Sequence, residues 1–496
     1  MPRRLRSVLH RDSLRRGTRL RHTLHRADPV APSHTADLSV NRPRRRVAGG
    51  LGGAHLCKRS TLLNRDELFA RARKSLPGGV CASTRLNVAL GHPLYVERAE
   101  GSRLYDVEGK PYLDMSCGHG AALLGHGHPA VRDALLQASE LGICCSSDMI
   151  HHVKLAEELC SLIPCAERVR FTNSGSEATL HAIRLCRAAT GRDLIVRFTG
   201  HFHGYHEHTF IGGHVPADHL DDPSSFRESP GIPEAMTQFI RAIPFNDLGA
   251  VERVLSVEGD RVATLILEPV DFNSGGIPPQ PGFLESLREL TRQHGVLLFF
   301  DEIQTSFKKS TGGAQADFGV TPDICTIGKS LGGGLALSAI CAGAELMDLY
   351  RPVGEVTHSG TFMAPLPNVL SGLAFLDQVT QPTFYPDLLG RFDTFYDEVD
   401  AMIARRGIPV QVPRHGARFG ILVGLDHPPI DYRDALCHRK DLWLAFIRHA
   451  FERGVYFHDY GGGPCHHGFG AAHSQQDIDS ILQVMDEAFG EIATEF

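Results

Sequence analysis

The chain has 496 residues, of which 42% are hydrophobic and 22% charged, and its 51 Lys and Arg against 57 Asp and Glu leave a formal net charge of −6. We therefore expect a soluble globular protein of two or three domains. The negative net charge excludes an overall basic nucleic-acid-binding protein. No apolar run reaches the roughly 18 to 20 residues that span a membrane. The 12 cysteines form no C-x-x-C pair, so we expect no zinc knuckle, no disulfide framework and a reducing, cytoplasmic compartment.

Residues 1–60 differ in composition from the rest of the chain. They contain 14 Arg and 1 Lys against 3 Asp and no Glu, without a sustained apolar period. We expect a disordered basic extension or an over-extended reading of the start site. The alternative is a mitochondrial transit peptide, because such peptides are rich in Arg and poor in acidic residues. An RNA-binding arm stays open as well, although no aromatic residues alternate with the basic ones.

Ordered structure is predicted from Asn64 onward. The stretch 64–79 indicates a helix with acidic residues in its first turn and a Pro-Gly-Gly stop, and residues 93–115 indicate a small antiparallel sheet. From about residue 120 to 345, apolar strands alternate with amphipathic helices, which is typical of an α/β fold whose largely parallel sheet is covered on both faces. Longer helices return beyond about Asn368. We expect the following divisions: an N-terminal segment at 61–119, a large domain at 120–367 and a small domain at 368–496.

The first candidate for chemistry follows the predicted strand "RVRFT". There the sequence Asn-Ser-Gly-Ser-Glu, residues 173–177, leads directly into a helix. Ser174 and Glu177 have the spacing of a capping box with Ser174 as the N-cap. Small residues at a helix N-terminus also leave backbone amides free for a phosphate, so Gly175 and Ser176 are candidate anion ligands.

The second candidate is Asp301, which follows the apolar strand "VLLFF". A carboxylate at the end of a buried strand is costly unless a partner compensates for its charge. One interpretation is a helix cap or a salt bridge. The other is an acid that stays charged beside a cationic ligand, such as a protonated ring nitrogen.

The third candidate is Lys329 in "ICTIGKSLGGG". Only 8 of the 51 basic residues are lysines, and an Arg would serve equally well as a simple cation. An amine that must lose its proton and act as a nucleophile can only be Lys. A buried, ion-paired structural lysine remains the alternative. We expect the glycines 332–334 to let the backbone pass close to a ligand.

Together these three elements match what is needed to hold pyridoxal phosphate. The cofactor requires an amine for its Schiff base and a carboxylate that keeps its ring nitrogen protonated. Lys329 follows Asp301 by 28 residues (329 minus 301), and the phosphate-type helix end precedes both. The combination is far more specific than any single member.

With these residues the sequence resembles class III pyridoxal-phosphate-dependent aminotransferases, in the branch that includes glutamate-1-semialdehyde 2,1-aminomutase and beta-amino-acid transaminases. The resemblance runs from about Asn64 to the end of the chain. It is carried by stretches such as "LYDVEGKPYLD", "LGHGHPAV", "RFTNSGSEATLHAIRLCRAATGRD", "FHGYH", "LILEPV", "GGAQADFGVTPDICTIGKSLGGG" and "SGTF". It implies the fold type I of pyridoxal-phosphate-dependent transferases, in which segments from both chain ends build a small α+β domain beside the large one.

The resemblance also assigns roles to residues. Lys329 falls on the Schiff-base lysine, which moves the proton between the substrate α carbon and the cofactor. The positions that fall on the other cofactor contacts are Asp301 at the ring nitrogen, Gln304 at the phenolic oxygen, Gly175 and Ser176 at the phosphate, and Phe202 on the ring face, followed by His203.

Two further residues concern the partner subunit and the substrate. Thr361 falls on a threonine that binds the phosphate from the neighbouring subunit, which implies at least a homodimer. Arg85 falls on an arginine that binds the substrate carboxylate, where a planar guanidinium forms a bidentate contact.

The stretch "GHFHGYHEH" raises the possibility of a metal site. Alternating histidines on one loop are a weak metal signal without a second cluster of ligands. The resemblance accounts for Phe202 and His203 in this stretch, so we predict no metal.

The reaction we expect is transamination between a carboxylate-bearing amino donor and a keto acid or aldehyde. The alternative is the intramolecular amino transfer of an aminomutase. Three departures argue against it: Gln304 replaces the usual Met, His119 replaces a pocket aromatic, and residues 211–228 lack the Gly-Ser-Gly gating loop. A cofactor-free binding protein is a third possibility, and the joint presence of Lys329 and Asp301 weighs against it. We expect no nucleic-acid or membrane partner.

Overall fold

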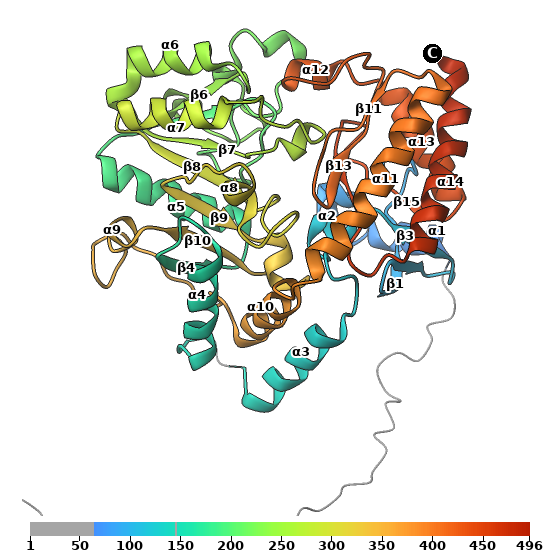
Figure 1. Ribbon diagram of the computed structural model, residues 1–496, viewed down its shortest axis with the longest axis horizontal. Coiled ribbons are helices and arrows are strands. Elements are labelled where there is room, and N and C mark those ends of the chain that lie inside the picture. The colour runs from blue at the N-terminus through green and yellow to red at the C-terminus, as the bar shows by residue number, and fades with distance from the viewer. Residues whose placement is uncertain (1–63, 144–145) are drawn as a thin grey trace, which may run out of the picture. The chain divides into compact units, whose positions relative to one another are not determined.

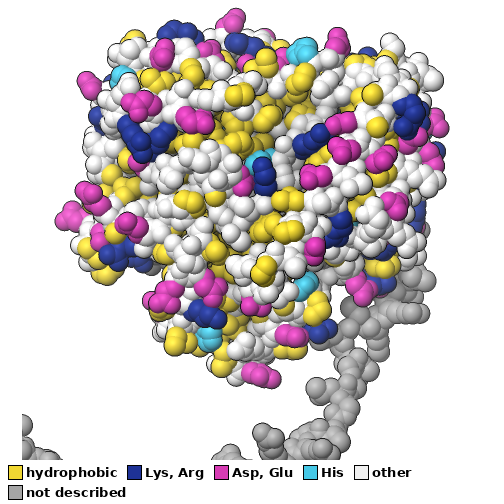
Figure 2. Space-filling model, in the orientation of Figure 1, with side chains coloured by type: hydrophobic (Ala, Val, Ile, Leu, Met, Phe, Trp, Pro, Cys, Tyr) yellow, Lys and Arg dark blue, Asp and Glu magenta, His cyan; other side chains and the backbone are white. Residues whose placement is uncertain are grey.

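The computed structural model describes residues 64–143 and 146–496 (Figure 1). The basic extension predicted for residues 1–60 lies outside the described residues. Within the part that is described, no helix is long and apolar enough to cross a membrane. Figure 2 shows Lys and Arg side chains interspersed with Asp and Glu over one face of the molecule.

A seven-stranded sheet forms the centre of the large domain. Its order is β4-β10-β9-β8-β7-β5-β6, and β10 runs antiparallel to β4 and β9 while the pairs from β9 to β6 are parallel. The predicted largely parallel sheet is confirmed, although the sequence did not single out β6 or β10. The strands are β4 (Arg168–Thr172), β5 (Leu194–Phe198), β6 (Ile240–Ile243), β7 (Val262–Leu267), β8 (Leu297–Glu302), β9 (Ile324–Ile327) and β10 (Ser338–Ala342).

Helices cover both faces of this sheet because its strands are apolar at successive positions. Ile266 and Phe299 belong to the cluster under α5 (Gly175–Thr190), whereas Leu267 and Phe300 belong to the cluster on the other face. Burial of a side chain such as Phe300 stabilises the fold by roughly 1.5 to 3 kcal/mol. The helices packed on that second face include α4 (Ile150–Leu162), α6 (Leu248–Glu258) and α7 (Phe283–Gln293).

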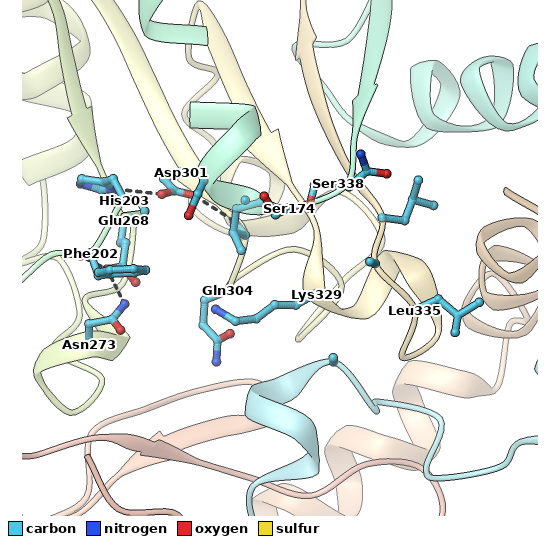
Figure 3. Close-up of a pocket in the computed structure, with 18 residues that line it drawn as sticks. Ser174, Phe202, His203, Glu268, Asn273, Asp301, Gln304, Lys329, Leu335 and Ser338 are labelled. Atoms are coloured by element: carbon cyan, nitrogen blue, oxygen red, sulfur yellow. Dashed lines mark hydrogen bonds and ion pairs between the residues drawn. The ribbon is translucent and has the colours of Figure 1, made fainter. Parts of the chain in front are cut away.

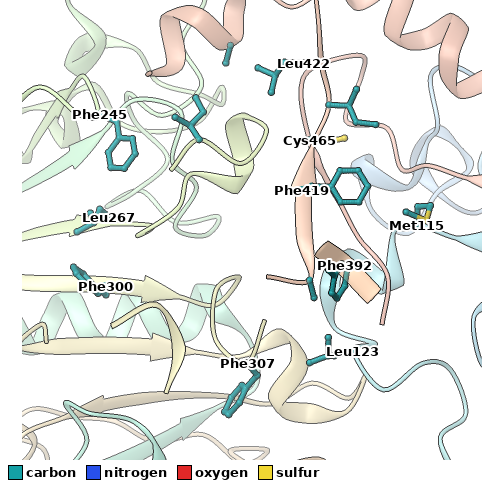
Figure 4. Packing of buried hydrophobic residues seen from close by; sticks show 14 of the residues in the cluster. Met115, Leu123, Phe245, Leu267, Phe300, Phe307, Phe392, Phe419, Leu422 and Cys465 are labelled. Carbon is teal, nitrogen blue, oxygen red and sulfur yellow. The ribbon is translucent and has the colours of Figure 1, made fainter. Parts of the chain in front are cut away.

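The segment before residue 119 joins the C-terminal part of the chain. The predicted antiparallel strands are present as β1 (Val96–Glu100), β2 (Arg103–Asp106) and β3 (Pro111–Asp114), and β15 (Val455–Tyr456) adds to β3 in parallel. One small sheet therefore contains strands from both chain ends. Its core is continuous with that of the large domain, since one cluster includes both Phe300 and Phe419 (Figure 4).

The remaining elements are mostly helices. The predicted first helix begins at the N-cap Asn64, whose side chain accepts a hydrogen bond from Glu67 N at 2.9 Å. This first helix is α1 (Arg65–Ala72). The other helices are α2 (Cys117–Gly120), α3 (Pro129–Leu141), α8 (Gly313–Asp317), α9 (Ala344–Met347), α10 (Leu366–Val379), α11 (Phe384–Arg406), α12 (Tyr432–Leu436), α13 (Lys440–Glu452) and α14 (Gln475–Ile492). Short strands complete the C-terminal part: β11 (Val410–Gln411), β12 (Arg414–His415), β13 (Arg418–Gly420), β14 (Leu422–Val423) and β16 (His466–His467).

The predicted domain boundary between residues 367 and 368 falls inside α10. This helix packs against α3 and α4 and against the short 3-10 turn Lys329–Gly332. In the view of Figure 1, α10 thus lies below β9 and packs against the turn that follows this strand.

Candidate active site

A cavity of about 280 Å³ lies where β4, β7, β8 and β9 end (Figure 3). The carboxyl ends of parallel strands share one edge of a sheet, so polar residues that follow them meet there. Seven of the nine residues singled out from the sequence line this cavity: Gly175, Ser176, Phe202, His203, Asp301, Gln304 and Lys329. The other two, Arg85 and Thr361, lie elsewhere.

Asp301 occupies the end of β8 and is held by three hydrogen bonds. Its Oδ2 accepts from His203 Nδ1 at 2.8 Å, and its Oδ1 accepts from Thr326 Oγ1 at 3.1 Å and from Ile303 N at 3.2 Å. Thr326 lies directly beside Asp301 in the register of β8 and β9. Burial lowers the pKa of His203, although Asp301 opposes the shift, so the neutral ring donates its Nδ1 proton to the carboxylate.

The turn before α5 forms a cradle for an anion. Ser174 is the N-cap and its Oγ accepts from Glu177 N at 3.2 Å. The carboxylate of Glu177 accepts from Asn173 N at 2.8 Å, one residue earlier than the predicted capping box requires. The amides of Gly175 and Ser176 have no acceptor among the described residues, which leaves two N–H groups at the positive end of a helix.

Close packing explains the glycines of this cradle. A Cβ at Gly175 would lie 3.1 Å from the Ile303 side chain, and a Cβ at Gly204 would lie 2.8 Å from the Ser176 Cα. Side chains at either position would push the turn outward. The Oγ of Ser176 accepts from Tyr205 N at 3.2 Å, which fixes the loop that carries Phe202 against the turn.

Lys329 lies two residues after the end of β9, and its side chain extends across the cavity toward Gln304 and Phe202 (Figure 3). Its φ of 43° lies in the left-handed region, which costs a non-glycine residue of order 1 kcal/mol. Burial lowers the pKa of Lys329 to about 8, although the carboxylates of Glu268 and Asp301 oppose the shift. The amine therefore loses its proton at a much lower pH than an ordinary lysine does.

The glycines after Lys329 do not have the role we expected. The cavity is lined by residues 335–338 instead of 332–334. Gly333 has a φ of 59°, and a Cβ there would lie 2.9 Å from both Ser371 Oγ and Val131 Cγ2. It permits a tight turn against α10 and α3, so the requirement for glycine comes from packing beneath the turn.

Sequence reasoning missed Glu268, which stands at the end of β7 and lines the cavity. It accepts hydrogen bonds from Phe202 N at 2.8 Å and from Asn273 Nδ2 at 2.7 Å. Burial and the neighbouring Asp271 raise the pKa of Glu268 well above its usual range. The signal was present, since "LILEPV" ends a buried strand with a carboxylate just as "VLLFFDE" does.

A larger chamber of about 880 Å³ shares Lys329 and Phe202 with the first cavity. Its walls include His119, Tyr460 and His466, and the latter two come from the C-terminal part of the chain. His119 Nδ1 lies 2.6 Å from the Tyr460 hydroxyl. Lys329 therefore borders both spaces.

Arg85 lies outside the chamber that contains Lys329. It lines a neighbouring cavity of about 390 Å³, and His119 contributes to the walls of both spaces. The 3-10 turn Ser83–Arg85 carries the arginine, and its Ser83 and Thr84 line the larger chamber. The exposed Arg85 and His119 thus line the same neighbouring cavity.

Thr361 is exposed on the loop before α10 and does not line the cavity of Lys329. The loop nevertheless lies near the anion cradle, because Asn173 Nδ2 is 4.0 Å from Met363 Sδ.

The histidines of the loop at 201–208 have separate contacts. His201 Nδ1 accepts from Glu268 N at 2.9 Å, His203 contacts Asp301, and His206 Nε2 lies 3.0 Å from Thr179 Oγ1. Within residues 64–143 and 146–496, no group of three or more His, Cys, Asp or Glu is placed to hold a metal ion.

The lowered pKa of Lys329 has a measurable consequence. In protein stripped of any bound aldehyde, the reductive methylation of Lys329 by formaldehyde and cyanoborohydride is expected to reach half its maximum near pH 8. A free lysine in a reference peptide, with a pKa of about 10.4, continues to gain reactivity above pH 10. Peptide mass spectrometry across pH 6 to 11 measures both. A Lys329 curve that coincides with that of the peptide would contradict the shift.

Comparison with known proteins places this site in context. The profile of the aminotransferase class-III family matches residues 87–489. Glutamate-1-semialdehyde 2,1-aminomutase of Laribacter hongkongensis (strain HLHK9) is 35% identical over 429 residues, covering 86% of this chain and 99% of its own.

Two solved structures are similar as well. An omega-transaminase from Sphaerobacter thermophilus matches with a TM-score of 0.80 and 29% identity, over 87% of this chain and 98% of its own. A beta-phenylalanine aminotransferase from Variovorax paradoxus matches with a TM-score of 0.78 and 27% identity, over 87% and 94%.

Proposed function

Because the chain belongs to the class III aminotransferase family, we propose that it transfers an amino group from a carboxylate-bearing donor to a keto acid or aldehyde. It is an enzyme that depends on pyridoxal 5'-phosphate. The observation that carries the proposal is the convergence of Lys329, Asp301 and the cradle at residues 174–176 on one cavity.

The residues of this cavity fit pyridoxal phosphate. The free amides of Gly175 and Ser176 suit the phosphate, and the carboxylate of Asp301 suits a protonated ring nitrogen. The Oε1 of Gln304 is buried without a hydrogen-bond partner among the described residues, so the amide has unused capacity toward a ligand. Lys329 would anchor the cofactor covalently.

When bound, pyridoxal phosphate supplies an aldehyde that condenses with amines and a ring that takes up electrons from the substrate. Asp301 holds the proton on the ring nitrogen, which keeps the ring electron-poor. Lys329, with its pKa lowered to about 8, accepts the proton of the substrate α carbon and returns it. Phe202 covers one side of the cavity and limits the access of water.

Transamination is the main proposal and intramolecular amino transfer is the alternative. Gln304 and His119 both lie on the walls of these cavities, at the positions where the sequence departs from aminomutases. The similar omega-transaminase and beta-phenylalanine aminotransferase support the first reaction, and the curated relative at 35% identity supports the second.

One experiment separates the two reactions. The purified holoenzyme is incubated with a panel of amino donors plus pyruvate or 2-oxoglutarate, and separately with glutamate-1-semialdehyde. Turnover that requires a keto acid, without isomerisation of the semialdehyde, would establish transamination. Isomerisation without any added keto acid would establish the mutase, and absence of both activities would overturn the proposed function.

Arg85 is proposed to bind the carboxylate of the substrate. Replacement by alanine is expected to raise KM for acidic donors about 10- to 100-fold, the range for a lost hydrogen bond between charged groups. KM for simple amines should change little. Steady-state kinetics of Arg85→Ala, with the exposed Arg98→Ala as the control, measures both. Equal losses with acids and amines would count against this role.

We also propose a homodimer in which Thr361 of one copy contacts the phosphate site of the other. Large apolar side chains lie exposed on α3, α4 and the loop of Thr361, including Ile150 at 78% and Phe362 at 62% exposure, as is typical of an interface. Thr361→Ala is expected to weaken cofactor binding about tenfold without dissociating the dimer. Cofactor titration and sedimentation velocity, with Thr357→Ala as the control, measure this. A wild-type monomer that retains the cofactor would contradict it.

The compartment is proposed to be the cytoplasm, with the mitochondrion as the alternative if residues 1–60 act as a transit peptide. The nine cysteines described are all free thiols, which supports a reducing compartment.

A further inference from the structure

His466 is a buried polar residue in the chamber of Lys329 that the proposed reaction does not yet use. It lies on β16, is 2% exposed, and lines the 880 Å³ chamber that Lys329 also lines. Its carbonyl and its ring both contact Arg418, which lies on β13. These contacts determine which of the two ring nitrogens carries the proton.

The Nδ1 atom of His466 is an acceptor. Arg418 Nη2 donates to it, and Gln304 Nε2 donates to the same atom at 3.0 Å. The oxygen and nitrogen of the Gln304 amide can exchange places by a 180° flip, so Gln304 can either donate to Nδ1 or accept from it. A guanidinium can only donate, so the contact with Arg418 alone requires Nδ1 to be an acceptor. The proton of the neutral ring therefore resides on Nε2.

Arg418 is a desolvated cation without an acidic partner. It is 1% exposed, makes no ion pair with any described residue, and donates to the carbonyls of Ser116 at 3.1 Å and His466 at 3.0 Å. An arginine remains charged in proteins. Its charge polarises the imidazole, which makes the Nε2–H a stronger donor, and it prevents a second proton from binding.

The Nε2 edge is the part of His466 that is open to the chamber. The Nδ1 edge is occupied by Arg418 and Gln304, and Nε2 has no partner among the described residues. Within residues 64–143 and 146–496, several polar side-chain atoms are fully buried and lack a hydrogen-bond partner, and His466 Nε2 is not among them. Since Nε2 has no partner either, it is not fully buried and borders open space. An unpaired, nearly buried donor that faces the chamber of Lys329 is free to donate to a ligand.

We propose that His466 binds the substrate, donating its Nε2–H to a carboxylate oxygen, and that Arg418 is a positioning residue which fixes its tautomer. The inference rests on the proposed function and adds a specificity determinant to the same site. It is independent of Arg85, because Arg85 lines the neighbouring cavity whereas His466 lines the chamber itself. A substrate carboxylate accepts the hydrogen bond from Nε2–H, and its negative charge compensates the charge of Arg418, which contacts the Nδ1 edge of the same ring.

The test compares an amino acceptor that carries a carboxylate with one that does not. KM is measured for pyruvate and for butanal, an aldehyde without a carboxylate, in the holoenzyme and in His466→Phe. We expect KM for pyruvate to rise about tenfold or more, while KM for butanal changes less than about twofold and kcat falls little. His466→Gln, which can place an amide N–H near the position of Nε2, should restore part of the pyruvate affinity.

His467→Phe is the matched control. This neighbouring histidine on β16 is fully buried and packs against Phe419, Trp443 and Phe457 without lining the chamber. It should lower thermal stability as much as His466→Phe or more, and leave the ratio of the two KM values unchanged. Arg418→Met, which frees Nδ1 to carry the proton, should reproduce the pyruvate defect.

The outcomes separate this inference from the proposed function. If the wild type transaminates neither acceptor with any donor, the proposed function fails. If the wild type is active but the pyruvate-to-butanal ratio is the same in His466→Phe, the inference is wrong. If His466→Phe does not fold, the pyruvate-to-butanal ratio of KM values is measured in His466→Gln and Arg418→Met instead. Ratios equal to that of the wild type in both variants would overturn the inference.

Discussion

Replacement of Lys329 by alanine is expected to abolish turnover while the protein still binds pyridoxal phosphate through the cradle at residues 174–176. The loss of proton transfer alone removes about 10²- to 10⁴-fold of the rate, and the loss of the covalent anchor adds to it. The fold should persist, because Lys329 Nζ makes no hydrogen bond or ion pair with another described residue. Relief of the left-handed backbone strain is not expected, since alanine meets the same restriction.

The measurement combines single-turnover rates with cofactor titration. Lys309→Ala, which removes an exposed lysine 20 residues earlier (329 minus 309), is the control and should retain full activity. Added methylamine should partly restore the α-proton transfer in Lys329→Ala, as an external base replaces the missing amine. A variant that keeps more than about a tenth of the wild-type rate, against the 10²-fold minimum for lost proton transfer, would rule out the assigned role of Lys329.

Replacement of Asp301 by asparagine is expected to lower kcat about 10²- to 10³-fold, the range for removing one preorganised electrostatic group from an active site. The amide keeps the size of the side chain and can still accept from His203, but it no longer carries the charge that holds a proton on the ring nitrogen. The cofactor should remain attached through Lys329. The loss should therefore appear in kcat and leave the cofactor content close to one per chain.

The control for Asp301→Asn is Asp323→Asn. Asp323 accepts from Leu298 N at 2.7 Å and pairs with Arg288 at 2.8 Å, at the opposite end of the strands from the cavity. Its replacement should reduce stability by roughly 1 to 3 kcal/mol with kcat unchanged. Similar kcat values for both variants would exclude a special role of Asp301.

The sequence was sufficient for the part of the site that follows the sheet strands. Asp301 lies at the end of β8, Lys329 stands two residues after β9, and Gly175 begins the helix that follows β4. The carboxyl ends of parallel strands lie on one edge, so this local pattern was enough to bring the residues together. Glu268 obeys the same rule and could have been predicted from it.

Local pattern did not reveal what the glycines after Lys329 are for. A glycine run indicates backbone freedom, but the neighbour that requires it can lie anywhere in the chain. For Gly333 that neighbour is Ser371 on α10, and the constraint is the space between a turn and a helix. Likewise, the exposed positions of Arg85 and Thr361 leave their roles as predictions.

The tertiary structure alone decided the other side of the chamber. His466 contacts Gln304 across 162 positions of the sequence, and Arg418 lies on β13, a different strand from the β16 of His466. No periodicity or motif in "GPCHHGFG" distinguishes His466, which faces the chamber, from His467, which faces the core. Strand-end residues are brought together by the regular geometry of the sheet, so the sequence by itself determined the cofactor side of the site. The substrate side depends on how segments distant in the sequence pack against one another, and that packing is set by long-range contacts that no local pattern encodes.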